Sequence, residues 1–224
     1  MNSNRKSYSW QRVNCSYEKG LYMRIERVES LDKRKCKVFT DEDFAFLLYN
    51  GELEKYGVCE GAVLEKRTER ELLDLLSRRA HERALNLLKV QDRTEGEMCR
   101  RLFQDGYPDS IVQETIGFLQ EYHFVDDARY AANYLQVHGK RKSQAELKLY
   151  LQRKGISREI IREQLEETEH DSGEAIRVLL EKKHYRAGET APEEKKKIIA
   201  YLMRRGFSWE DIRREMKEQE DALS

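Results

Sequence analysis

Hydrophobic positions recur with a long period over the C-terminal two-thirds of the chain. Gly106, Gly155 and Gly206 lie 49 and 51 residues apart, and hydrophobic residues stand at the same five offsets from each glycine. They are Met98, Leu102, Tyr107, Val112 and Ile116; Leu147, Leu151, Ile156, Ile161 and Leu165; and Ile198, Leu202, Phe207, Ile212 and Met216. Self-similarity at a fixed period of this length predicts three copies of one structural repeat.

Each copy predicts a helix, a corner and a second helix. Hydrophobic residues four apart form one face of the helix before the glycine, and glycine can take the left-handed conformation that ends it. The segments 94–97, 143–146 and 190–193 fit the capping box that opens this helix. A further amphipathic helix precedes each pair. We therefore expect nine helices in three units, which bury their apolar stripes by stacking on their neighbours.

The junction between the first two units reads FVDDARYA, residues 124–131. Its two aspartates could be an acid/base pair or hard-metal ligands, but Asp is common at helix N-caps, which favours capping. The segment HDSGEA, residues 170–175, occupies the matching place between the second and third units. We expect five residues to be structural caps and corners: Asp126, Asp127, Gly106, Gly155 and Gly206.

The N-terminal third has a different pattern. Residues 20–46 are rich in β-branched and aromatic residues that alternate with polar ones, which predicts a hairpin or three-stranded meander. A short helix is expected at 47–56. The predicted fold is mostly α: three tandem three-helix repeats in an elongated curved solenoid, preceded by a small β-containing element. The predicted parts are the β-containing extension 1–62, a connecting helix 63–81, repeats 82–127, 128–172 and 173–218, and a tail 219–224.

Composition and charge narrow the function. Hydrophobic residues make up 39% and charged residues 38%, which suits thin modules with much solvated surface. The formal net charge is +0, yet residues 1–40 carry ten Lys/Arg against four Asp/Glu, and residues 128–162 carry nine against two. Basic segments in a neutral chain point to a local anionic partner. No stretch approaches the roughly 20 apolar residues of a membrane span, so we expect a cytoplasmic protein.

Candidate chemistry is sparse. The four cysteines lie too far apart for zinc-knuckle spacing, and free thiols in a reducing compartment are expected. The five histidines show no HxxxH or HExxH spacing, and there is no Gly-rich phosphate loop or GxSxG elbow. The sequence therefore predicts no catalytic residue, no metal site and no cofactor, and hence no enzyme.

Several of these segments resemble the RecX family of bacterial recombination regulators. The resemblance lies in the tandem units, in Val125-Asp126-Asp127 followed by Tyr130-Ala131, and in the Lys154-Gly155-Ile156 turn within ELKLYLQRKGISREIIREQLEE, residues 146–167. It is strong over residues 82–218 and weaker over the β-rich segment, and the third unit departs most from the family pattern.

The resemblance implies a modulator of the RecA recombinase. RecX-like proteins bind in the helical groove of the RecA filament on single-stranded DNA, and most limit filament growth, strand exchange and ATP hydrolysis. For this chain it therefore implies regulation of homologous recombination, DNA repair and the SOS response. The expected partners are the RecA filament and, through weak direct binding, single-stranded DNA, with no membrane partner and a monomeric chain.

Basic residues of the second and third units are the candidate contacts with RecA or DNA. A solvated face is the alternative for any single one of them, but the cluster in the second unit has few nearby acids. A stand-alone nucleic-acid binder with helix-turn-helix-like units also remains open, although the helix after Gly155 lacks the usual base-reading residues. The candidates are Lys140, Arg141, Lys142, Lys148, Arg153, Lys154, Arg158, Arg162, Lys195, Lys196, Lys197, Arg204 and Arg205.

Overall fold

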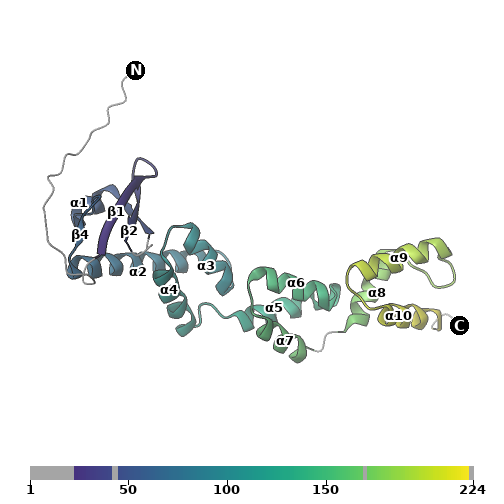
Figure 1. The fold of residues 1–224 in the computed structure, drawn as a ribbon. Helices are drawn as coiled ribbons and strands as arrows, with labels where there is room; N and C mark the ends of the chain where they lie inside the picture. The colour runs from purple at the N-terminus through teal and green to yellow at the C-terminus, as the bar shows by residue number, and fades with distance from the viewer. Residues whose placement is uncertain (1–22, 42–44, 169–170, 222–224) are drawn as a thin grey trace, which may run out of the picture. The chain divides into compact units, whose positions relative to one another are not determined.

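The computed structural model describes residues 23–41, 45–168 and 171–221, and its chain divides into two compact units, 1–72 and 73–224. Figure 1 shows strands only in the N-terminal part of the described chain, with helices in the rest. The prediction of a mostly helical chain with three three-helix repeats after a small β element is confirmed. Its elongated, curved stacking stays a prediction.

The first unit contains a four-stranded antiparallel sheet in the order β3-β2-β1-β4. Alternation in β2 and β3 places one set of side chains on the buried face, where Val38 is opposite Phe46 and Cys36 is opposite Leu48. The bounds are β1 (Met23–Ser30), β2 (Lys35–Thr40), β3 (Ala45–Tyr49), helix α1 (Asn50–Tyr56) and β4 (Val63–Leu64).

Two details of the first unit correct the sequence prediction. The helix expected from residue 47 begins at Asn50, because Leu47 to Tyr49 continue β3 and pair with β2. The fourth strand, β4, was not predicted. It has two residues, which pair with Met23 and Arg24 of β1, and a segment of that length carries no alternation to detect. The part of the predicted extension at residues 1–22 lies outside the described residues.

The second unit contains the repeats. Repeat 1 consists of α3, α4 and the C-terminal part of α2. Repeat 2 consists of α5, α6 and α7, and repeat 3 consists of α8, α9 and α10. The bounds are α2 (Lys66–Leu88), α3 (Glu95–Gln104), α4 (Asp109–Glu121), α5 (Asp127–His138), the 3-10 turn η1 (Gly139–Arg141), α6 (Gln144–Lys154), α7 (Arg158–Glu167), α8 (Ser172–Lys182), α9 (Pro192–Arg204) and α10 (Trp209–Asp221).

Each repeat has its own hydrophobic core, and the periodic residues form it. Thirteen of the fifteen residues at the repeated offsets are buried. The other two, Tyr107 and Leu165, are partly buried and pack against the cores of repeats 1 and 2. The repeat core residues were therefore correctly identified from their spacing.

The three corner glycines have the backbone conformation that ends a helix. Gly106, Gly155 and Gly206 have φ angles of +85°, +96° and +86°, the left-handed region that favours glycine. At each corner the next residue donates its N–H to the carbonyl five residues back, as Ile156 does to Leu151 at 3.2 Å. This pattern of backbone bonds is the Schellman motif.

Two further expectations about the helices are wrong. A connecting helix was expected at 63–81, with the first helix of repeat 1 after it, but α2 is one continuous helix from Lys66 to Leu88, because residues 78–88 contain no Gly or Pro that would interrupt it. The third capping box does not form. α9 begins at Pro192 after Ala191, which has no side-chain acceptor, and Thr190 instead accepts a hydrogen bond from the N–H of Arg186 at 2.9 Å.

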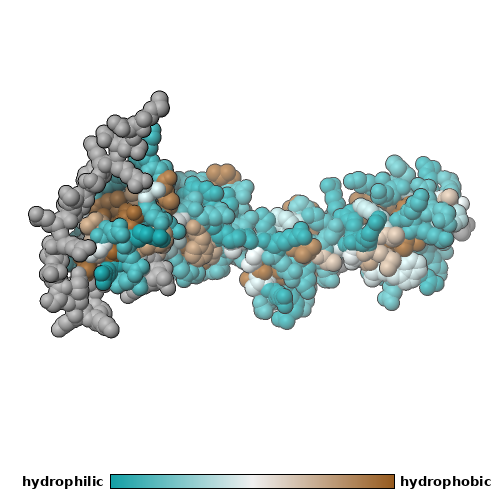
Figure 2. All heavy atoms as spheres, turned by 45° about the horizontal axis from the view of Figure 1, so that its top comes forward, coloured by the Kyte–Doolittle hydropathy of each residue, from teal (hydrophilic) through white to brown (hydrophobic). Residues whose placement is uncertain are grey.

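The surface of the described chain is largely polar. On the face that Figure 2 shows, hydrophilic residues cover most of the helical repeats and hydrophobic areas are smaller and separated. Among the described residues, none of the helices combines the length and the apolar character needed to cross a membrane.

Candidate partner-binding surface

The aspartates at the junctions are helix caps. Asp126 is the N-cap of α5 and accepts the N–H of Arg129 at 2.9 Å. Asp127 is half-buried and accepts the N–H of Glu95 at 2.9 Å, so it caps the start of α3. Burial raises the pKa of the Asp127 carboxyl. Asp171 is the N-cap of α8 and accepts the N–H of Gly173 at 2.8 Å. Each of these aspartates therefore caps a helix in the structure, and Asp127 also links two helices.

A joint connects repeats 1 and 2, and we call it the first joint. The hydroxyl of Thr94, which is fully buried, accepts the N–H of Glu97 at 3.2 Å and donates to the carbonyl of Lys154 at 2.6 Å. The Lys154 ammonium lies 2.6 Å from the Glu97 carboxylate. A helix N-terminus in one repeat is thus fastened to the corner of the next.

The same arrangement recurs between repeats 2 and 3, and we call it the second joint. The buried hydroxyl of Ser143 accepts the N–H of Glu146 at 3.1 Å and donates to the carbonyl of Arg205. The Arg205 guanidinium makes a bidentate contact with the Glu146 carboxylate, in which two of its nitrogens lie 2.8 and 2.9 Å from the two carboxylate oxygens. A bidentate pair of this kind holds a fixed geometry, so the second joint sets the position of repeat 3 on repeat 2.

Both joint cations are held in the charged form. The hydrogen bond with Glu97 raises the pKa of Lys154, and the hydrogen bond with Glu146 raises the pKa of Arg205. Their side chains are about one-quarter exposed, at 24% each. Lys154 and Arg205 therefore stabilise the joints, and their charge is largely matched within the chain.

Glycine is required in the first joint because the backbones approach closely. A methyl group on Gly96 would lie 3.0 Å from the Gly155 Cα and 3.2 Å from the Lys154 carbonyl oxygen. We expect Gly96→Ala to lower the free energy of unfolding by about 1–3 kcal/mol, the usual cost of overpacking. Chemical denaturation measures this change.

The matched control is Gly117→Ala in α4, where a methyl group would meet nothing within 4 Å. Alanine is favoured over glycine in a helix by roughly 0.5–1 kcal/mol, so this variant should be more stable than the parent. If Gly96→Ala also stabilises the chain, the first joint is not close-packed in solution.

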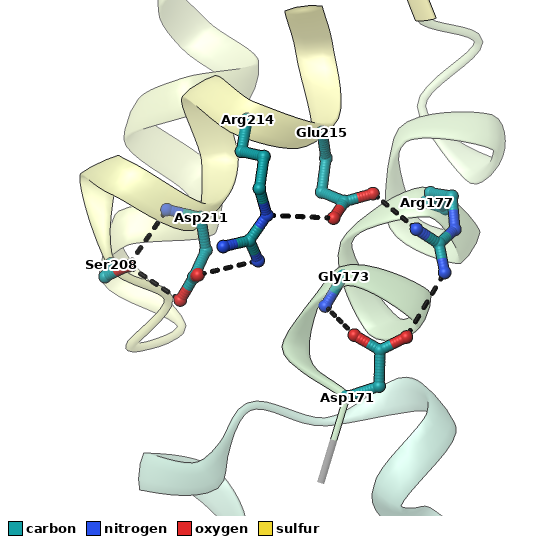
Figure 3. Close-up of polar contacts among 7 residues, drawn as sticks. All are labelled: Asp171, Gly173, Arg177, Ser208, Asp211, Arg214 and Glu215. Atoms are coloured by element: carbon teal, nitrogen blue, oxygen red, sulfur yellow. Dashed lines mark hydrogen bonds and ion pairs between the residues drawn. The ribbon is translucent and has the colours of Figure 1, made fainter. Parts of the chain in front are cut away.

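Repeat 3 carries a polar network around one buried carboxylate, which the sequence did not reveal (Figure 3). The Glu215 carboxylate of α10 is 4% exposed and lies 2.6 Å from the Arg177 guanidinium of α8. Arg177 also contacts Asp171 at 3.3 Å, and Arg214 lies 3.6 Å from Glu215. Gly173 leaves the space that the Glu215 carboxylate occupies. The network joins the first and last helices of repeat 3.

The remaining candidate cations divide into paired and open groups. Lys140 pairs with Glu174 at 3.1 Å, Lys195 with Glu220 at 2.7 Å and Lys196 with Glu193 at 3.0 Å. Arg162 lies 3.9 Å from Glu166, and the Lys142 ammonium contacts the Tyr134 hydroxyl and the rings of Tyr134 and Tyr150. Six candidates are exposed and form no ion pair within the described ranges, and we call them the open cations: Arg141, Lys148, Arg153, Arg158, Lys197 and Arg204.

Two of the open cations lie next to the joints. Arg153 and Arg204 each stand two residues before a corner glycine and are exposed beside a joint cation. Lys148 lies on the same helix as Arg153 and is also exposed, while Leu147 and Leu151 of that helix are buried. Exposed cations at matching places in repeats 2 and 3 can contact an anionic partner without breaking an internal ion pair.

The described residues contain no group of three or more His, Cys, Asp or Glu side chains that could hold a metal ion. What the geometry offers is therefore a set of jointed helical repeats with open cations, which suits binding of an anionic surface.

Comparison with known proteins identifies the repeats. Family models described as the first, second and third three-helix domains of RecX match residues 80–119, 126–165 and 171–216. Regulatory protein RecX of Clostridium tetani is 33% identical over 208 residues, which are 91% of this chain and 86% of the relative. Regulatory protein RecX of Clostridium acetobutylicum is 28% identical over 203 residues, 87% of this chain and 95% of the relative.

Solved structures agree on the fold. A crystal structure of regulatory protein RecX has a TM-score of 0.59 at 21% identity, and covers 87% of this chain and 99% of that one. The crystal structure of RecX from Lactobacillus salivarius has a TM-score of 0.57, also at 21% identity, and covers 66% of this chain and 97% of that one. The three matched domains and the full-length relatives show that this chain belongs to the RecX family of regulatory proteins.

Proposed function

We propose that this chain regulates the RecA recombinase by binding in the groove of the RecA filament on single-stranded DNA, and that it inhibits ATP hydrolysis, strand exchange and filament growth. The proposal rests on membership of the RecX family. The open cations provide the physical means, because they face solvent and can meet DNA phosphates or an acidic protein surface. In this role the chain acts in the cytoplasm as a binding protein and not as an enzyme.

A stand-alone reader of DNA sequence is the alternative, and α7 argues against it. This helix follows the corner of repeat 2, where a reading helix would lie. Its exposed residues alternate in charge, with Arg158 and Arg162 beside Glu159 and Glu163. Carboxylates repel phosphate, and the residues of base-reading type in this helix, Arg158, Arg162 and Gln164, each stand next to a glutamate.

The test is steady-state ATP hydrolysis by RecA on single-stranded DNA. We expect substoichiometric amounts of the chain to slow hydrolysis, because one bound molecule can block growth of a whole filament. Replacing three open cations of repeat 2, Arg141→Gln, Lys148→Gln and Arg153→Gln, should weaken inhibition. It should also reduce the dependence of log affinity on log salt by up to about 2–3, since each of the three phosphate contacts contributes roughly 0.7–0.9.

The matched control removes the same charge elsewhere in the second unit. Lys182→Gln, Arg213→Gln and Lys217→Gln alter exposed residues of repeat 3 outside the candidate set, and should leave inhibition unchanged. Exposed charges contribute little to folding, under about 1 kcal/mol each, so both variants should fold. If RecA hydrolyses ATP at the same rate with and without the chain, the proposed function is wrong.

A further inference from the structure

The N-terminal sheet has one buried face and one face that carries rings and cations. The strand register places Arg27 opposite Phe39, Phe39 opposite Ala45, and Lys35 opposite Tyr49. Directly paired residues project from the same face. We call this the open face, and its main side chains are Arg27, Lys35, Lys37, Phe39, Leu47 and Tyr49. All six are partly or fully exposed.

Rings and cations alternate on the open face. The Arg27 guanidinium carbon lies 4.2 Å from the centroid of the Phe39 ring, and the Lys37 ammonium lies 4.9 Å from it. The Lys35 ammonium lies 5.5 Å from the centroid of the Tyr49 ring. Arg27 pairs with Glu29 at 3.1 Å, but within the described ranges neither Lys35 nor Lys37 has a carboxylate within ion-pair distance.

A hollow of about 590 Å³ opens beside Phe39. Its lining includes Arg27 and Ala45 of the open face, and the carboxylates of Glu26 and Glu60. Carboxylates repel phosphate but accept hydrogen bonds from the amino groups of bases. The hollow therefore suits the base of a nucleotide. Lys35 and Lys37, which form no ion pair with another described residue, lie on the same face outside the hollow and suit its phosphates.

We propose that the open face of the N-terminal sheet binds single-stranded nucleic acid. Bases would displace the cations that lie over the Phe39 and Tyr49 rings and stack there, and the displaced Lys35 and Lys37 would contact phosphates. Aromatic rings spaced among cations on a surface are the means by which proteins hold single strands without reading a sequence. This inference goes beyond the proposed function, because it assigns direct binding of single strands to a site in the N-terminal unit, whereas the candidate contacts of the proposed function lie on the repeats.

The test is a fluorescence-anisotropy titration of the full chain against a labelled mixed-sequence oligodeoxynucleotide of about 12 nucleotides, a typical site length for such surfaces. Phe39→Leu with Tyr49→Leu keeps apolar bulk and removes the π faces. We expect at least about fivefold weaker binding, because stacking on one aromatic ring contributes on the order of 1–3 kcal/mol by substitution. A duplex of the same length should bind less tightly than the single strand.

The matched control places the same substitutions on exposed rings of repeat 1. Tyr122 and Phe124 are 59% and 46% exposed, and Tyr122→Leu with Phe124→Leu should bind the oligonucleotide as the parent does. If the variant with Phe39→Leu and Tyr49→Leu loses its circular dichroism signal, and so does not fold, the titration is repeated with a variant that carries Lys35→Gln and Lys37→Gln. That pair should lower affinity and reduce the salt dependence by about 1, at roughly 0.7 per phosphate.

Two outcomes would overturn the inference. One is a folded sheet variant that binds the oligonucleotide like the parent. The other is a variant that retains oligonucleotide binding but loses binding to RecA filaments, which would make the open face a protein-binding surface. Since the titration contains no RecA, its failure leaves the proposed function untouched, and failure of RecA inhibition leaves the open face untouched.

Discussion

Leu151→Asp is expected to unfold repeat 2. Leu151 is completely buried in the core that α5, α6 and α7 share. A carboxylate there would have no partner and would lose its hydration, and the leucine would also leave a void. We expect the free energy of unfolding to fall by at least about 4 kcal/mol. Hydrogen exchange should show that the amides of residues 127–167 lose protection.

Leu149→Asp is the control for this change on the same helix. Leu149 is 48% exposed, so its replacement should cost less than about 1 kcal/mol, mostly through the lower helix propensity of aspartate. Equal loss of protection in the two variants would mean that α6 does not bury the face that carries Leu151.

Arg177→Met is expected to destabilise repeat 3 by about 2–3 kcal/mol. The change removes the main partner of Glu215, whose carboxylate is 4% exposed, and leaves only Arg214 at 3.6 Å. The Arg177 side chain is itself 46% exposed, but its removal is costly because the charge of Glu215 stays buried. The fluorescence of Trp209, in α10 of repeat 3, reports this unfolding in a urea titration.

A second substitution distinguishes charge from packing. Glu215→Gln in the Arg177→Met background removes the stranded charge and should recover at least half of the lost stability. Arg162→Met is the exposed control, since its partner Glu166 is 72% exposed and 3.9 Å away, and should cost less than about 1 kcal/mol. If the double variant is no more stable than Arg177→Met alone, packing and not charge explains the loss.

The repeats could be predicted because helix geometry fixes the spacing of core residues. The position four residues before the corner glycine, which is Leu151 in repeat 2, is hydrophobic in every copy and is buried in all three. The joints could not be predicted, because they depend on which surfaces of neighbouring repeats meet. Lys154 and Arg205 read as surface cations in the sequence, yet they pair with Glu97 and Glu146.

A signal for the joints was nevertheless present. Glutamate occupies the third helical position of α3 and α6, and a cation precedes the corner glycine of the following repeat. At the corner of repeat 1 and in the second helix of repeat 3, which form neither joint, the charge at these positions has the opposite sign. The corner of repeat 1 has Asp105, which pairs with Arg83 of α2 at 2.6 Å, and repeat 3 has Lys197 at the position of Glu146. Charges that match only across neighbouring copies indicate contact between copies.

The joints also fix the positions of two open cations, Arg153 and Arg204. Because Lys154 and Arg205 are each one residue from an open cation, the joint that holds the corner also holds Arg153 and Arg204. A variant that loosens a joint, such as Gly96→Ala, is therefore expected to weaken partner binding as well as stability.

Cosedimentation with RecA filaments tests the central claim most directly. RecA is assembled on single-stranded DNA with a non-hydrolysable ATP analogue, and the fraction of this chain in the pellet is compared with that obtained on bare DNA. We predict that RecA raises the bound fraction several-fold, and that Arg141→Gln, Lys148→Gln and Arg153→Gln together reduce it. A bound fraction that is the same on bare DNA and on RecA-coated DNA would contradict the account, and would make the chain a nucleic-acid binder that does not recognise the filament.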